Sequence, residues 1–174
     1  MFILNSIKKE DATGELKLVY KMIEKSLGFI PPHFELFATI DTKSMMEFLE
    51  LHKYFTTHEH IDSNLLAYLR LYIANKEHRA YCINFNSVML TNMGINKNII
   101  TNILDEVHNI PLEQAQVKLL KKVIKSIYNS KQFEKNDLDE LYERGFNDKD
   151  FFDLLSYAVN FMGKSKMIEV YLKK

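Results

Sequence analysis

The ten-residue stretch "LLAYLRLYIA", residues 65–74, narrows the folds open to this chain more than any other segment. It is apolar nearly all round a helix, and Arg70 is its one charged residue. A helix without a polar face is stable only when it is buried. The sequence therefore predicts a central helix over residues 63–75, with the other helices packed around it.

Turn-forming residues are scarce, with 5 glycines and 3 prolines in 174 residues. All-β folds need many turns, so this scarcity favours long helices. Apolar residues recur at helical spacing, and Gly28 and Gly94 stand where helices are expected to end. The pattern predicts an all-α helical bundle of about eight helices. One domain over residues 1–174 is expected, with residues 1–10 as an N-terminal arm.

Four segments carry local helix predictions. Two prolines are expected to open a short helix over about 32–40. A helix over 79–93 would hold the cysteine, and one helix is predicted over 97–107. The last helix is predicted through the C-terminal segment, with a weak point at Gly163.

The charge balance is neutral, with 23 basic and 23 acidic residues. This gives no electrostatic reason to expect nucleic acid or an anionic membrane as a partner. The lysines of one later helix are predicted to form a solvated face; they are Lys118, Lys121, Lys122 and Lys125.

One cysteine cannot form an internal disulfide, so a reducing cytosol fits the composition. No signal peptide or membrane-spanning run is recognised, and the cytoplasm is the expected location.

The single cysteine, Cys82, stands in "EHRAYCINFN" near the start of a predicted helix. The helix dipole and the charge of Arg79 would lower the pKa of its thiol, and His78 could act as its base if the helix has already begun. Alternatively, Cys82 is a small packed hydrophobe, because free cysteine is among the most buried residue types. Both interpretations remain open at this stage.

Three segments together resemble the alkylhydroperoxidase-D-like superfamily, which also contains the carboxymuconolactone decarboxylases. They are "LGFIPPHFELFATI", the apolar "LLAYLRLYIA" and "YCINFNSVMLTNMGI". The resemblance covers about residues 26–106 and extends more loosely into the second half. It implies an all-α fold and a homo-oligomer.

The peroxidase branch of that superfamily has the motif Cys-x-x-Cys-x-x-x-His, with a Glu twelve residues before the first cysteine. On this chain the second cysteine falls on Cys82, the first on Arg79, the His on Asn86 and the Glu on Ala67. Without a second thiol, no intramolecular disulfide can complete a two-cysteine cycle. Asn86 exchanges no proton near neutral pH, and Ala67 has none to give.

Three functions are considered. In the first, the chain is a peroxidase-related thiol oxidoreductase or redox sensor that needs no cofactor. Cys82 reacts with a small hydroperoxide, Arg79 lowers its pKa, Asn86 and Tyr81 orient the substrate, and an external thiol reduces the product. In the second, the chain is a non-catalytic oligomeric scaffold that binds a small apolar or acidic metabolite, or only partners. The third is a lyase or decarboxylase that acts on a lactone and uses His78 or His33 as acid or base.

Two further groups have alternative interpretations. His58 and His60 in "HEH" could chelate a metal from a loop, but no third ligand is evident nearby, so a solvated loop and no metal site are expected. His33 could line a cleft, although helix capping or exposure is favoured. A group of apolar side chains could form a pocket wall or plain core; they are Met45, Met46, Phe48, Phe85, Met89 and Met93.

Overall fold

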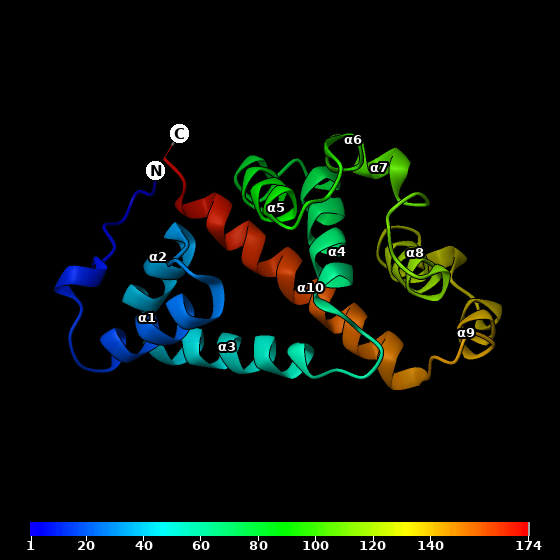
Figure 1. The fold of residues 1–174 in the computed structure, drawn as a ribbon, viewed down its shortest axis with the longest axis horizontal. Helices are drawn as coiled ribbons and strands as arrows, with labels where there is room; N and C mark the ends of the chain where they lie inside the picture. Colours follow the sequence, from blue (N-terminus) through cyan, green and yellow to red (C-terminus); the bar gives the residue numbers. More distant parts are fainter. Residues whose placement is uncertain (174) are drawn as a thin grey trace. The chain divides into compact units, whose positions relative to one another are not determined.

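The computed structural model describes residues 1–173 and is built from α-helices (Figure 1). Eight helices have eight residues or more, so the all-α prediction is confirmed. In place of β-strands, residues 1–173 contain one isolated bridge, between Phe2 and Leu172. None of the helices in this range is both long and apolar enough to cross a lipid bilayer. The helices are α1 (Gly14–Leu27), α2 (Pro32–Ile40), α3 (Thr42–Thr56), α4 (Ser63–Lys76), α5 (Ala80–Asn92), α6 (Lys97–Thr101), α7 (Ile103–Glu106), α8 (Gln114–Tyr128), α9 (Lys135–Tyr142) and α10 (Asp148–Tyr171), with short 3-10 turns at Lys9–Asp11 and Ser130–Gln132.

The chain groups into two compact units. One unit holds residues 1–57 together with the C-terminal residues from Val170 onward, and the other holds His58–Glu169. The single domain over residues 1–174 therefore stays a prediction, and each unit is described by itself.

In the first unit, α1, α2 and α3 lie together (Figure 1). Their facing side chains form an apolar core. Pro32 is the first residue of α2, as expected, because proline has no N–H to satisfy there. Tyr20 on α1 donates a hydrogen bond to the carbonyl of Ile7 at 2.7 Å, and this contact fixes the N-terminal arm. The core side chains include Val19, Tyr20, Ile23, Ala38, Met45 and Leu49, so Met45 is core.

In the second unit, α4 is the buried central helix that the sequence predicts. Leu65, Leu69 and Leu71 are fully buried, and α4 packs on α5, α7 and α8. The helix begins at Asp62, whose carboxylate accepts the N–H of Leu65 at 2.8 Å. Arg70, in the middle of α4, is therefore carried on a segment that is largely withdrawn from water.

Two local predictions are wrong. The helix expected over 97–107 is divided at Asn102 into α6 and α7. The Asn102 side chain bonds to the Asn98 side chain at 2.9 Å, and asparagine readily leaves the helical conformation. The expected weak point at Gly163 does not interrupt α10, which runs for 24 residues. Burial of Leu154, Ala158 and Ile168 outweighs the roughly 1 kcal/mol cost of one glycine.

The solvated lysine face predicted on α8 holds only at Lys121, which is exposed, and is wrong for the other three lysines. Lys122 is buried and pairs with Asp137 at 2.5 Å and with Glu140 at 3.1 Å. Lys125 binds the same Asp137 carboxylate at 2.7 Å, and Lys118 pairs with Glu140. The acids come from α9, which folds back against α8, so this pairing is a tertiary contact.

Asp137 is the centre of this ionic cluster. Burial opposes its ionisation, but hydrogen bonds from Lys122, Lys125 and the N–H of Glu134 outweigh burial and hold the pKa of Asp137 below its usual range. A carboxyl whose folded pKa is depressed stabilises the fold above its unfolded pKa, about 3.9, and loses that effect as pH falls.

We expect Asp137→Asn to lower the free energy of unfolding at pH 7 by about 3 kcal/mol, because it leaves the buried Lys122 without its carboxylate. Urea denaturation followed by circular dichroism measures this. The difference from the unsubstituted protein should shrink as pH falls below about 4.

Asp139→Asn on the same helix is the matched control, with an expected change within about 0.5 kcal/mol. Equal effects of the two substitutions would mean that the cluster does not stabilise the fold.

Candidate functional site

Cys82 lies in the first turn of α5 and is buried, with 3% of its surface exposed. Burial raises the pKa of its thiol to about 11. The positive charge of Arg79 lowers that pKa and the carboxylate of Glu169 raises it, and both effects are smaller than that of burial. At neutral pH Cys82 is therefore a protonated thiol.

Arg79 is the N-cap residue of α5, immediately before the helix begins. Its guanidinium pairs with Glu169 on α10 and lies 3.6 Å from the Glu77 carboxylate. Its Nε is buried and has no hydrogen-bond acceptor among residues 1–173. The sequence predicts that the positive charge of Arg79 lowers the pKa of Cys82. In the structure that charge is paired with two carboxylates instead.

The histidines considered as acid or base occupy different environments. His78 is exposed in the turn before α5, with a left-handed φ of 55°, and α5 begins only at Ala80. The condition for pairing His78 with Cys82, a helix that has already begun, is therefore not met. His33 is buried rather than exposed, and its ring packs edge-on against Phe34 at 4.4 Å. His78 and His33 belong to different units of the chain.

Asn86 joins Cys82 to a polar network in the second unit. Its amide donates to the Cys82 carbonyl at 2.8 Å, and its side-chain oxygen accepts from Arg70 Nε at 2.9 Å. Arg70 Nη1 also donates to the hydroxyl of Tyr157 on α10, at 2.5 Å. Asn86 is 2% exposed, so both ends of its amide are held by protein contacts. Tyr81, which precedes Cys82 on α5, is only partly buried.

Arg70 and Tyr157 were not recognised as site residues from the sequence. Arg70 carries a detectable signal, because it is the single charge in the apolar stretch 65–74. It also lies three residues after Ala67, on the same face of α4. Tyr157 carries no such signal, because 87 positions separate it from Arg70.

The "HEH" loop is fixed to the start of α10 rather than solvated. His58 Nδ1 accepts the N–H groups of His60 and Ile61, each at 3.2 Å, so the neutral ring carries its proton on Nε2. His58 Nε2 lies 3.2 Å from the Asp153 carboxylate. His60 Nδ1 hydrogen-bonds Asp150 at 2.9 Å.

Despite this cluster, residues 1–173 hold no group of three or more His, Cys, Asp or Glu side chains that could bind a metal ion. The histidines and aspartates instead form contacts that order the loop.

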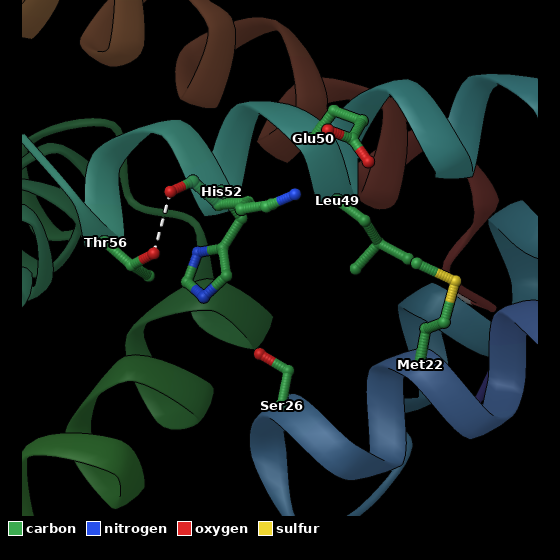
Figure 2. Close-up of a pocket in the computed structure, with 7 residues that line it drawn as sticks. Met22, Ser26, Leu49, Glu50, His52 and Thr56 are labelled. Carbon is green, nitrogen blue, oxygen red and sulfur yellow. Dashed lines mark hydrogen bonds between the residues drawn. The ribbon is translucent and has the colours of Figure 1, made fainter.

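A separate hollow of about 220 Å³ lies between α1 and α3 (Figure 2). The Ser26 hydroxyl and the His52 ring point toward it, and Leu49 and Met22 close its other side. Its remaining lining residues, Glu50, Lys53 and Thr56, are exposed. The hollow is open to water and contains none of the predicted site residues.

No protein-family model and no curated protein sequence matches this chain. Seven chains of solved structures do match. A peroxidase-related protein from a Silicibacter species superposes with a TM-score of 0.78 at 15% identity, over 98% of this chain and 89% of its own. The chain has the alkylhydroperoxidase-D-like fold.

A second matching crystal structure has the same fold. It is a peroxidase-related protein from Ralstonia eutropha, described as an alkylhydroperoxidase AhpD core, and superposes with a TM-score of 0.76. Its sequence is 14% identical, and the match covers 97% of this chain and 88% of that one. Identities this low establish the alkylhydroperoxidase-D-like fold, whereas activity depends on the residues of the site.

We expect the alkylation rate of Cys82 by iodoacetamide to be low at pH 7 and to rise only at strongly alkaline pH, because the pKa of the buried thiol is about 11. Mass spectrometry of the native protein measures the rate at each pH. The protein in concentrated urea is the control, and it should show the ordinary thiol pKa of about 8.5. A native inflection at or below that value would contradict the assignment.

His60 supplies a pH-dependent contact. Its hydrogen bond to Asp150 raises the pKa of His60 above 6.5. A group with a raised folded pKa stabilises the fold fully below its unfolded pKa, about 6.5, and this effect is lost as pH rises through the folded pKa. His60 is a third exposed, so the stabilisation is at most about 1 kcal/mol.

A proton NMR titration of the His60 ring should give a pKa above that of the urea-unfolded chain. The difference should decrease in Asp150→Asn, which keeps a side-chain oxygen but removes the charge. An unchanged His60 pKa in that variant would remove Asp150 as its cause.

Proposed function

We propose that this protein is a small-molecule-binding protein with an alkylhydroperoxidase-D-like fold and without a thiol relay. The observation that carries the proposal is the state of Cys82. Its thiol is buried and protonated, and the neighbouring Asn86 amide is held at both ends by Arg70 and the Cys82 carbonyl. This arrangement is suited to holding a fixed polar surface rather than to moving protons.

The chemistry of a peroxidase cycle requires groups that this site lacks. A thiol of pKa about 11 is ionised in roughly one molecule in ten thousand at pH 7, and the thiolate is the nucleophile. An asparagine amide neither accepts nor releases a proton near neutral pH. Ala67, at the position where the resemblance places a glutamate, contributes only a methyl group.

A second candidate is the single-cysteine oxidoreductase or redox sensor. One observation favours it: the charge of Arg79 acts on Cys82 in the direction that stabilises the thiolate. For this function the ion pair between Arg79 and Glu169 has to open and Cys82 has to become accessible. An external thiol then reduces the sulfenic acid, because the chain has no second cysteine.

A homo-oligomer remains a prediction that accompanies both functions. The helix α10 supports it, because Phe152, Val159 and Met167 are large apolar side chains exposed at 65%, 56% and 44%. Exposed apolar side chains along one helix are typical of surfaces that pack against another chain.

The two candidates differ in their dependence on Cys82. We expect consumption of an organic hydroperoxide, with dithiothreitol as reductant, to be the same for the unsubstituted protein and for Cys82→Ser. We also expect small molecules that raise the melting temperature of the protein to do so equally in Cys82→Ser. Peroxide consumption that falls at least about tenfold in Cys82→Ser would instead establish the oxidoreductase.

A further inference from the structure

Arg70 is a partly buried cation whose polar partners are all neutral. Among residues 1–173 it hydrogen-bonds only the Asn86 side-chain oxygen and the Tyr157 hydroxyl, and it forms no ion pair with any carboxylate. The other two arginines differ from it. Arg79 pairs with two glutamates, and Arg144 lies exposed to water. Only Arg70 combines burial with the absence of a counter-ion.

The free-energy cost of partly burying Arg70 depends on which groups surround its guanidinium. Withdrawing a guanidinium from water is unfavourable unless an anion or sufficient hydrogen bonds compensate it. Its neighbours on α4, Leu69 and Leu71, are fully buried, and Asn86 and Tyr157 are 2% and 8% exposed. The two neutral partners satisfy hydrogen bonds, and among residues 1–173 no carboxylate pairs with the charge.

The donors that remain on Arg70 form a fork. A guanidinium has five N–H groups. Nε is used by Asn86 and one N–H of Nη1 by Tyr157. Those two bonds are the side-chain hydrogen bonds of Arg70 within residues 1–173, so the second N–H of Nη1 and both of Nη2 remain for other acceptors, and the side chain keeps partial access to solvent. Adjacent N–H groups of this kind match the two oxygens of a carboxylate.

Asn86 and Tyr157 hold the guanidinium in place before any ligand binds. They come from α5 and α10, so three helices fix the plane of the fork. A pre-positioned donor loses less side-chain entropy on binding than a free one.

We propose that Arg70 binds the carboxylate of a small organic acid. This assignment rests on the proposed function, ligand binding, and specifies its ligand class. One cation is matched by one negative charge, and the guanidinium of Arg79 is already paired with Glu77 and Glu169.

Side-chain NMR of the arginines tests the assignment directly. The chain has three arginines, so its ¹⁵Nε–H spectrum contains three signals, and single substitutions to glutamine identify each. Benzoate and butyrate are the probes, and benzamide and butyramide are neutral controls of the same shape. We expect the acids to shift the Arg70 signal saturably and to leave the Arg144 signal unchanged.

Two variants separate the charge from the fold. Arg70→Gln removes the charge but retains an amide donor for Asn86, and it should weaken benzoate binding at least about tenfold in calorimetric titration. Arg144→Gln removes the same charge from an exposed site and should bind benzoate as the unsubstituted protein does. Equal binding by Arg70→Gln and Arg144→Gln overturns the proposal.

The remaining outcomes distinguish this inference from the proposed function. Equal binding of acids and amides overturns the carboxylate assignment but leaves ligand binding standing. A stronger Arg70 shift with inorganic phosphate than with benzoate also overturns it. If carboxylate binding depends on Arg70 and peroxide consumption depends on Cys82, this inference stands and the proposed non-catalytic function is overturned. An Arg70 signal that none of the acids shifts overturns the inference.

Discussion

The burial of α4 is the constraint on which the second unit depends. Leucines at 65, 69 and 71 and Ile73 are fully removed from water, and each contributes about 1.5–3 kcal/mol relative to an exposed side chain. Such a helix requires neighbours on every side, and α5, α7 and α8 supply packing contacts. The same burial sets the chemistry of the unit, because the charge in the buried middle of α4, at Arg70, must be accommodated with little access to bulk water.

The second unit accommodates its buried polar groups in three ways. Lys122 forms an ion pair with Asp137, and both side chains stay charged because their hydrogen bonds outweigh the effect of burial on their pKa values. Cys82 remains neutral, because burial is stronger than the effect of Arg79. Arg70 keeps its charge with only neutral partners. The first two arrangements are complete within the protein, whereas the third leaves a charge and several donors for a ligand.

The alkylhydroperoxidase-D-like fold and the chemistry of its site are therefore separate questions in this protein. The backbone superposes on peroxidase-related proteins over nearly its full length. The side chains near Cys82 supply no second thiol, and Asn86 and Ala67 cannot transfer protons. A fold can retain its packing while its site changes, because packing depends on many apolar contacts and catalysis on a few polar groups.

The sequence by itself determined most of the helices. The apolar pattern of residues 65–74, the prolines at the start of α2 and the glycines after α1 and α5 act locally, within one or two helical turns. The sequence also located Cys82 and Asn86, because the spacing of the Cys-x-x-Cys-x-x-x-His motif places both on α5. It left open whether the thiol is reactive or packed, since burial depends on elements distant in sequence.

Tertiary structure alone decided the charges and contacts of the site. Arg70 meets Tyr157 across 87 positions, and His58 meets Asp153 across 95. The lysine face of α8 met acids of α9 that no local pattern assigned to it. Helix formation follows from neighbouring residues, whereas burial, ion pairing and pKa follow from which helices pack together, and these contacts exist only in the folded chain.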